Sequence, residues 1–163
     1  MKLTSQEEYG LRCLLQIGRL APGGSLTIPE ISQAEGISKE YAAKLLRLLR
    51  QTGFIKSVRG QAGGYILARP AAEITIGEAL AALGGRLYEA GFCQDHSGVS
   101  SVCNRSVDCS VRSLWRGVQQ LVDQVLGKTT LKDLLSDEQQ AASHVNGLVA
   151  TADIRPAPPV SHS

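Results

Sequence analysis

Aromatic side chains are scarce in this sequence of 163 residues, where Phe, Trp and Tyr together make up only 4%. Apolar residues of all kinds make up 43%, so the core has to be built mainly from Leu, Ile, Val and Ala. No run of about 18 apolar residues occurs, which argues against a membrane-spanning helix. The opening, MKLTSQEEYG, is polar and charged and lacks the apolar segment of a signal peptide. These absences predict a cytoplasmic protein with an aliphatic core and no membrane contact.

Motifs of catalysis are also missing. No Ser, His and Asp set stands out, and the glycine-rich run 60–64 leads from one expected strand into another, whereas a phosphate-binding loop leads into a helix. A hydrolase site built from Cys93, Asp95 and His96 would lack a motif that donates to an oxyanion. The sequence therefore predicts a protein that is not an enzyme and has no small-molecule substrate.

Positive charge is concentrated in the first part of the chain, although the formal net charge of the whole is only +2. Residues 1–69 hold ten Lys and Arg against five Asp and Glu, a net of +5. Residues 70–163 hold seven against ten, a net of −3. A basic half of this kind indicates contact with a polyanion, and uneven scatter of charge is the alternative.

Capping boxes mark three helix starts, because a Thr side chain and a Glu three residues later each satisfy a backbone N–H group there. These pairs are Thr4 with Glu7, Thr27 with Glu30, and Thr75 with Glu78. Ser38 is a further N-cap. The pattern predicts helices near residues 5–20, 28–36, 39–52 and 76–83, the first with Leu11, Leu14, Leu15 and Ile17 on its buried side.

The segment after the third helix reads as a β-hairpin, with strands over 54–59 and 65–69 and a glycine turn over 60–64. Two short helices joined by a Gly-containing turn outline a helix-turn-helix, and a hairpin directly after them is a wing. The fold class predicted is mainly α with a small β-hairpin wing, that is, a winged helix-turn-helix plus a long dimerisation helix.

The rest of the chain is predicted from composition and apolar spacing. Residues 91–109 are rich in Gly, Ser, Asn, Asp and Cys and read as a loop, and an amphipathic helix follows near 110–126. Thr130 caps a short turn or helix through Leu135. We expect four parts: a winged helix-turn-helix DNA-binding domain over 1–83, a cysteine-rich loop over 84–109, a dimerisation helix and short C-terminal helix over 110–136, and a mobile tail over 137–163 that is partly helical at most near 137–145.

The helix expected over 39–52 carries the candidate DNA contacts. Recognition helices use early residues for base edges and cations for phosphates. Tyr41, Leu45, Leu48 and Leu49 can face inward. The residues expected to face the major groove are Lys39, Glu40, Ala42, Ala43 and Lys44, and the small Ala42 and Ala43 would let the helix sit close. The candidates on this helix are Ser38, Lys39, Glu40, Tyr41, Ala43, Lys44, Arg47 and Arg50. A charged, solvated helix face is the alternative.

Arg59 and Gly60 are the candidates in the wing. An arginine at a hairpin tip is well placed to enter a minor groove, where the negative potential attracts it. The glycines of the turn permit a tight bend and a close approach of the backbone. An ordinary hairpin with one exposed arginine is the alternative, but helix-turn-helix, wing and basic charge together favour binding to double-stranded DNA.

Three of the four cysteines fall close together, as Cys93, Cys103 and Cys109. Clustered thiols in a reducing cytosol more often bind metal or undergo redox chemistry than form structural disulfides. Thiolates ligate iron–sulfur clusters and zinc, and a fourth ligand would have to come from Asp95 or His96 in the loop, or from Glu7 or Glu8 on the first helix. Cys13 is interpreted as a small buried hydrophobe.

Several stretches carry a resemblance to a known family: the opening MKLTSQEEYGLR, the run GISKEYAAKLLRLLRQTGFIKSVRGQAGGYILA, the segment EITIGEAL, and CSVRSLWRGV followed by TTLKDLL. Through them the chain resembles the IscR, NsrR and RirA group of bacterial iron–sulfur regulators, the Rrf2 superfamily. The VRGxxGGY wing is fairly specific, and the cysteine loop followed by a Leu-Trp helix is more specific still.

The resemblance implies a homodimer that binds operator DNA and pairs through the helix over 110–126. It implies that Cys93, Cys103 and Cys109 ligate an iron–sulfur cluster near the DNA-binding unit of the other subunit. In the nitric-oxide-sensing branch an acidic residue on the first helix completes the site, and Glu8 stands at that position. A four-iron cluster (4Fe–4S) is preferred here to a two-iron cluster (2Fe–2S).

The sequence departs from this family at three places. The histidine that serves as fourth ligand in the IscR branch is replaced by Arg112, which favours Glu8. The gap of nine residues between the first two cysteines is longer than usual, which keeps His96 as an alternative ligand. Arg59 matches the wing arginine, but Ala43 replaces an acidic residue that tunes the choice of DNA sequence in IscR.

The function predicted is a dimeric transcription regulator that senses nitric oxide, redox state or iron status through an iron–sulfur cluster. One alternative is a cluster-free winged-helix regulator that uses thiols or zinc. A second alternative is a small iron–sulfur electron or cluster carrier, for which salt-dependent, sequence-specific DNA binding would not be expected.

Overall fold

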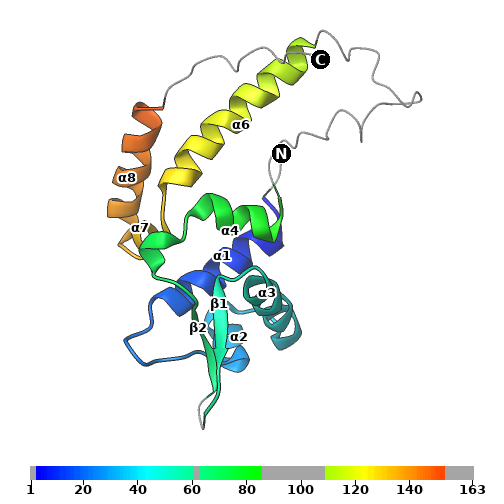
Figure 1. Cartoon of the computed structure of the whole chain (residues 1–163), viewed down its shortest axis with the longest axis vertical. Coiled ribbons are helices and arrows are strands. Elements are labelled where there is room, and N and C mark those ends of the chain that lie inside the picture. The colour runs from blue at the N-terminus through cyan, green and yellow to red at the C-terminus, as the bar shows by residue number, and fades with distance from the viewer. Residues whose placement is uncertain (1–2, 61–62, 86–108, 153–163) are drawn as a thin grey trace, which may run out of the picture.

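The fold comes from a computed structural model, in which residues 3–60, 63–85 and 109–152 are described (Figure 1). The helices in chain order are α1 (Ser5–Gly18), α2 (Ile28–Glu35), α3 (Lys39–Gln51), the 3-10 turn η1 (Ala71–Glu73), α4 (Ile76–Leu83), α6 (Ser110–Lys128), α7 (Leu131–Leu134) and α8 (Glu138–Ala150). The strands are β1 (Ile55–Val58) and β2 (Gly64–Leu67). Within these ranges, no helix is both long and apolar enough to cross a membrane.

All three predicted capping boxes are present, and Thr130 with Asp133 forms a fourth. The backbone N–H of Thr27 donates to Oε2 of Glu30 at 2.7 Å, which satisfies a group that has no partner within the helix. The helix α2 ends at Gly36, whose φ of 64° is a left-handed conformation that favours glycine. These local signals explain why the helix starts could be predicted from sequence alone.

The wing is an antiparallel pair of strands in which Ile55 lies opposite Leu67 and Val58 opposite Gly64. An isolated bridge joins Leu26 to Tyr65 and ties the hairpin to the connection between α1 and α2. The mainly α fold with a small hairpin wing is therefore confirmed.

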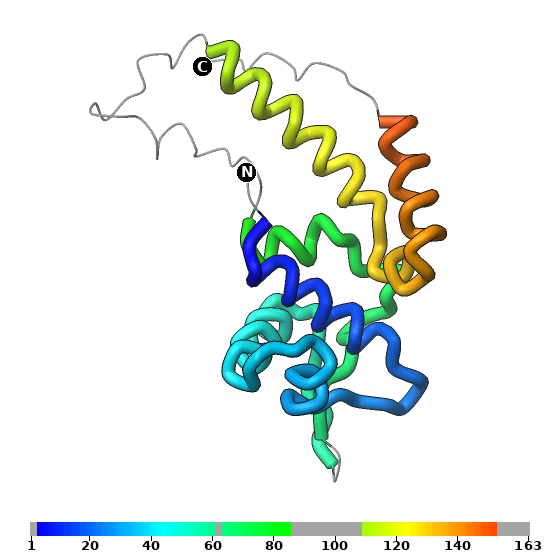
Figure 2. Tube along the Cα trace, turned by 180° about the vertical axis from the view of Figure 1, so that it is seen from behind, coloured from blue at the N-terminus to red at the C-terminus, as the bar shows by residue number. Residues whose placement is uncertain are grey.

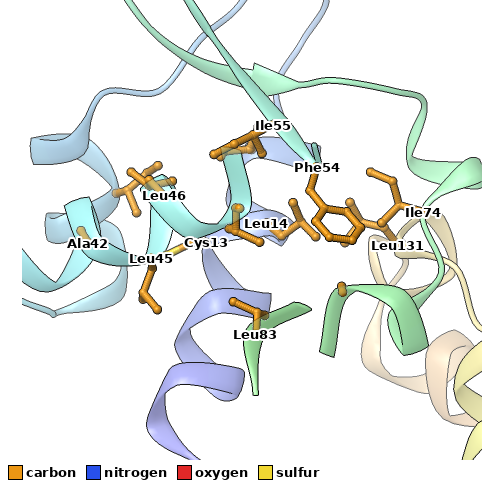
Figure 3. Close-up of a cluster of buried hydrophobic side chains, with 14 of the residues drawn as sticks. Cys13, Leu14, Ala42, Leu45, Leu46, Phe54, Ile55, Ile74, Leu83 and Leu131 are labelled. Carbon is orange, nitrogen blue, oxygen red and sulfur yellow. The ribbon is translucent and has the colours of Figure 1, made fainter. Parts of the chain in front are cut away.

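The core is aliphatic, as the composition predicted, and Phe54 is its only buried aromatic side chain among the described residues. Figure 3 shows side chains from α1, α3, β1 and α4 meeting in one cluster with Leu131 of α7. Its members are Cys13, Leu14, Ile17, Ile31, Ala42, Leu45, Leu46, Leu49, Phe54, Ile55, Ile74, Ile76, Ala79, Leu83 and Leu131. On α1, Leu14 and Ile17 are buried as expected, whereas Leu11 and Leu15 are only partly buried.

Two helices stand apart from this core. In Figures 1 and 2, α6 and α8 lie side by side and rise away from the body, and the hairpin projects in the opposite direction. Two backbone hydrogen bonds fix the carboxyl-terminal end of α6. The N–H of Ile76 donates to the carbonyl oxygen of Thr129 at 2.8 Å, and the N–H of Leu131 donates to the carbonyl oxygen of Ile74 at 2.8 Å. The amino-terminal half of α6 extends away from α1 and α4 (Figure 1).

The helix α8 differs from the expectation of a tail that is partly helical at most near 137–145. It runs to Ala150 as one continuous helix, and Asp137 caps it by accepting from the N–H of Gln140 at 2.8 Å. The helix packs against α6 and α7, so tertiary contact stabilises a segment whose composition is only weakly apolar. The expected loop over 91–109 lies outside the described residues except for Cys109, and the four-part division of the chain stays a prediction.

Candidate functional site

The recognition helix α3 turns its cations outward. Its buried side consists of Ala42, Leu45, Leu46 and Leu49, while Lys39, Glu40, Lys44, Arg47 and Arg50 are exposed. Ala42 is fully buried, so the expectation that it faces the major groove is wrong. Ala43 is half-buried and stays on the outer side with Lys44.

The start of α3 carries a fixed hydrogen-bonding group. The side chain of Ser38 caps the helix by accepting from the N–H of Tyr41 at 3.1 Å. The pKa of Glu40 is held below its usual value by its own backbone N–H and then by the Ser38 hydroxyl, so this exposed carboxylate is charged at neutral pH. A carboxylate at this place can accept a hydrogen bond from a cytosine amino group in the major groove.

Tyr41 has a second role besides its place on the recognition helix. It is half-buried, and its ring meets that of Tyr9 on α1 edge to face, with 6.2 Å between the centroids. Such pairs stabilise packing beyond the area that they bury. Tyr41 therefore joins the recognition helix to α1, which the sequence reading did not anticipate.

The wing places Arg59 at the exposed end of β1, beside Gly60. Gly60 has a φ of 146°, a conformation that other residues rarely adopt. The turn end of the strand pair is tightly packed, because Gly64 lies opposite Val58 and a Cβ at Gly64 would come within 2.7 Å of the backbone oxygen of Leu26. Arg59 thus follows directly after a strand pair whose turn end is tied to the connection between α1 and α2.

Of the three clustered cysteines, the structure describes only Cys109, and Cys93, Cys103 and the alternative ligand His96 lie outside the described residues. Cys109 is a free, half-buried thiol at the N-cap of α6, where its Sγ accepts from the N–H of Arg112 at 3.4 Å. Among residues 3–60, 63–85 and 109–152, no three His, Cys, Asp or Glu side chains gather as a metal site would need.

Glu8 lies on α1 with its side chain 41% exposed. Its Oε1 accepts from Nε of Arg12 at 2.7 Å, and Nη1 of Arg12 also lies 4.0 Å from Oε2 of Glu35. The Arg12 guanidinium stands over the Tyr9 ring, 5.5 Å from its centroid. Arg12 thus connects Glu8 to α2 through Glu35, and to α3 through Tyr9. Its spacing of four residues from Glu8 was the sequence signal that could have indicated this pair.

Cys13 does not belong to this site. It is completely buried, and burial raises the pKa of its thiol to about 12, with the Glu35 carboxylate adding to the effect. A neutral thiol in an apolar core is neither a nucleophile nor a metal ligand. The interpretation of Cys13 as a small buried hydrophobe agrees with this placement.

The amino-terminal end of α1 packs against the carboxyl-terminal end of α4. The Gln6 side chain donates to the carbonyl of Leu83, and a Cβ at Gly84 would collide with the Glu7 side chain. Glu8 therefore directly follows Gln6 and Glu7, which contact Leu83 and Gly84 at the end of α4. The segment with the clustered cysteines follows α4 in the sequence. This joint gives Glu8 a fixed position relative to the end of α4.

A helix-turn-helix with an outward basic helix and an adjoining arginine-tipped hairpin defines the class of winged-helix DNA-binding proteins. Within that class, residues 3–137 match the Rrf2 family, described as "Iron-dependent Transcriptional regulator". The chain belongs to this family of transcription regulators and is an Rrf2-type DNA-binding regulator.

Named relatives agree with the family assignment. The chain is 31% identical over 139 residues to the HTH-type transcriptional regulator IscR of Escherichia coli O1:K1, which covers 85% of this chain and 83% of that protein. It is similar to the structure of CymR, the global cysteine regulator of B. subtilis, with a TM-score of 0.67, 29% identity, and coverage of 84% and 99% of the two chains. For T. potens IscR the TM-score is 0.65 and the identity 30%, with coverage of 83% and 86%.

Proposed function

We propose that this regulator works as a homodimer in the cytoplasm and senses nitric oxide, redox state or iron status through an iron–sulfur cluster. Cys93, Cys103, Cys109 and Glu8 are the ligands in this proposal. The observation that carries it is the connection of Glu8, through Arg12 and Tyr9, to Tyr41 on the recognition helix. A ligand in this position can transmit its own state to the surface that contacts DNA.

The side chains that are described fit the ligand role. Cys109 is a free and accessible thiol, and Glu8 presents a carboxylate that is not buried in the core. A carboxylate holds iron less tightly than a thiolate, which suits an exchangeable position in a sensor. When bound, a cluster with three thiolates and one oxygen ligand supplies a centre that reacts with nitric oxide and oxidants. We prefer the four-iron form to the two-iron form.

The coupling acts through Arg12. If Glu8 ligated a cluster, the Arg12 guanidinium would lose its hydrogen bond at 2.7 Å and would keep Glu35 and the Tyr9 ring as neighbours. Glu35 is itself held by Nε2 of Gln16 at 2.6 Å and is 8% exposed, so the network has little slack. A change at Arg12 would therefore act on α2 through Glu35 and on α3 through Tyr9, and the two ligation states would differ in DNA affinity.

DNA contact in this proposal uses one helix and one hairpin from each subunit. Lys39, Lys44, Arg47 and Arg50 contact phosphates, while Ser38, Glu40, Tyr41 and Ala43 face base edges or fix the helix. Arg59 and Gly60 enter the minor groove. The exposed apolar side chains of α6 support pairing of two copies through this helix, which sets the spacing of two recognition helices across two half-sites.

Replacing the proposed oxygen ligand tests the proposal. We expect the Glu8→Ala variant, purified without oxygen, to lose or bleach the visible absorption of the cluster faster than wild type. Glu73→Ala, which removes an exposed carboxylate on η1, serves as the matched control. DNA affinity is measured in both variants before and after exposure to nitric oxide, on a duplex selected from random sequences. An unchanged cluster and an unchanged response in Glu8→Ala would remove Glu8 from the site.

A cluster-free regulator that uses thiols or zinc is the second candidate. The free, half-buried thiol of Cys109 also suits this reading, and CymR, named as a cysteine regulator, has a TM-score to this chain close to that of IscR. Analysis of iron, sulfide and zinc in the same preparation separates the two candidates. The small electron or cluster carrier is disfavoured by the membership in a family of transcription regulators.

A further inference from the structure

Exposed apolar side chains gather on the two helices that stand away from the core. Five large hydrophobic residues of the described chain are exposed, and four of them lie on α6 and α8. The four are Val111, Leu114, Trp115 and Val149, with relative exposures of 59%, 60%, 38% and 58%. Val111, Leu114 and Trp115 follow one another at the spacing of one helix face, and an exposed apolar face on a soluble domain marks an interaction surface.

The carboxyl-terminal half of α6 and the end of α8 together enclose a groove of about 350 Å³. Leu121, Val122, Val125 and Leu126 form one wall, and Val149 and Ala152 form the other. In Figure 1 the two helices run side by side here, and the amino-terminal half of α6 extends past the end of α8. The first half of α6 therefore carries an exposed apolar ridge of Val111, Leu114 and Trp115, and its second half forms an apolar groove with α8.

We propose that this groove receives the amino-terminal half of α6 from a second copy of the chain, so that α8 is part of the dimer interface. The inference rests on the proposed dimer and assigns it a further element. In a two-fold arrangement with antiparallel α6 helices, each ridge of Val111, Leu114 and Trp115 meets the groove of its partner. Both ridges and both grooves are covered at once, as a self-complementary interface requires.

The area needed for a stable dimer also calls for a second helix. The 19 residues of α6 at about 1.5 Å each give a length of roughly 28 Å, and a helix about 11 Å wide then presents a face of roughly 300 Å². A standard interface buries about 800 Å² on each partner. A wall from α8 beside α6 adds area on the side where the partner's ridge lies.

The helix α8 lies outside residues 3–137, the part of the chain that matches the family. Residues 3–137 supply α6 and the ridge, and the helix that follows them supplies the second wall of the groove. The inferred role of α8 is therefore a property of this chain that cannot be transferred from the family match.

A charge placed in the second wall tests the inference. Val149→Asp is expected to raise the dimer dissociation constant at least about tenfold, measured by sedimentation of the full chain. Ser143→Asp places the same charge on an exposed part of α8 that does not line the groove and is expected to leave the constant unchanged. Val149 is already 58% exposed in the single chain, so the substitution removes little buried packing and the helix content measured by circular dichroism is expected to match wild type.

Leu114→Asp, on the ridge, separates this inference from the proposed dimer. We expect it to dissociate the dimer as well. If Leu114→Asp dissociates the dimer while Val149→Asp behaves as Ser143→Asp does, the role of α8 is overturned and pairing through α6 stands. If Leu114→Asp leaves the dimer intact, both are overturned. A disulfide between chains in a Leu114→Cys, Val149→Cys protein, with Cys93, Cys103 and Cys109 each changed to Ser, would support the antiparallel register.

Discussion

At the scale of the residue, Arg12 is the centre of the site. It binds Glu8 and lies near Glu35 and the Tyr9 ring, so one guanidinium touches three groups that lead to α1, α2 and α3. The sequence offered Glu8 as one of several possible fourth ligands, and the resemblance favoured it. Its partner could be predicted from the spacing of four residues, but Tyr9 and Tyr41 meet only because α1 and α3 cross, which no local pattern specifies.

Arg59 gives a prediction at this scale. Arg59→Ala is expected to weaken binding to duplex DNA and to reduce the slope of log affinity against log salt concentration by about 0.9, since the cation proposed to displace a counterion from the minor groove is lost. Lys132→Ala, which removes an exposed cation on α7, is the control and is expected to leave the slope unchanged. Titrations at several salt concentrations decide it, and equal slopes for wild type and Arg59→Ala would contradict a wing contact.

At the scale of the element, helix starts were predictable and helix partners were not. A capping box is encoded in four consecutive residues, so Thr27 with Glu30 could be recognised without the fold. The end of α8 depends instead on packing against α6 and α7, and the helix predicted near 137–145 ended too early. The buried position of Ala42 was not predicted, because a small side chain gives little indication of which helix face is covered.

The capping box of α7 predicts how stability responds to acid. The pKa of Asp133 is lowered by the Thr130 side chain, then by the Thr130 N–H, with His144 and Lys132 adding smaller effects. Because the folded pKa lies below the unfolded one, the carboxylate stabilises the fold above the unfolded pKa of about 3.9, and this contribution is lost as pH falls through the folded pKa.

Asp133→Asn is therefore expected to lower the free energy of unfolding by about 1 kcal/mol at pH 7. Denaturant titrations of wild type and variant at a series of pH values measure the difference. The difference is expected to shrink below about pH 4, where wild type loses the same charge. A difference that stays constant down to pH 2 would show that the carboxylate charge is not its cause.

Two glycines within helices, Gly10 at the contact between α1 and α4 and Gly147 on α8, are expected to respond in opposite ways to replacement by alanine. A Cβ at Gly10 would collide with the Leu83 side chain, which is only 2% exposed and would have to shift within the core. Gly10→Ala is expected to cost about 1–3 kcal/mol. Gly147→Ala on α8, where an added Cβ meets nothing, is expected to stabilise by about 0.5–1 kcal/mol. Thermal unfolding compares the two, and a stabilising Gly10→Ala would contradict the close α1–α4 contact.

At the scale of the whole molecule, sequence and structure agree on a basic DNA-binding body with a long helix that leaves it. The charge bias toward residues 1–69 and the apolar stripe of α6 could be seen in the sequence. The groove between α6 and α8 could not, because its second wall comes from a segment whose composition predicts little. The spatial relation of the three clustered cysteines to Glu8 likewise stays a prediction.

The proposed function depends most on whether this Rrf2-family regulator carries an iron–sulfur cluster. The most direct measurement is the absorption spectrum of the protein purified without oxygen, with iron and sulfide counted in the same sample. The proposal predicts a brown protein with visible sulfide-to-iron bands and matched amounts of iron and sulfide, whose ratio to protein gives the cluster type. A protein that is colourless, and remains so after incubation with iron and sulfide, would contradict it and leave Cys93, Cys103 and Cys109 as a thiol or zinc switch.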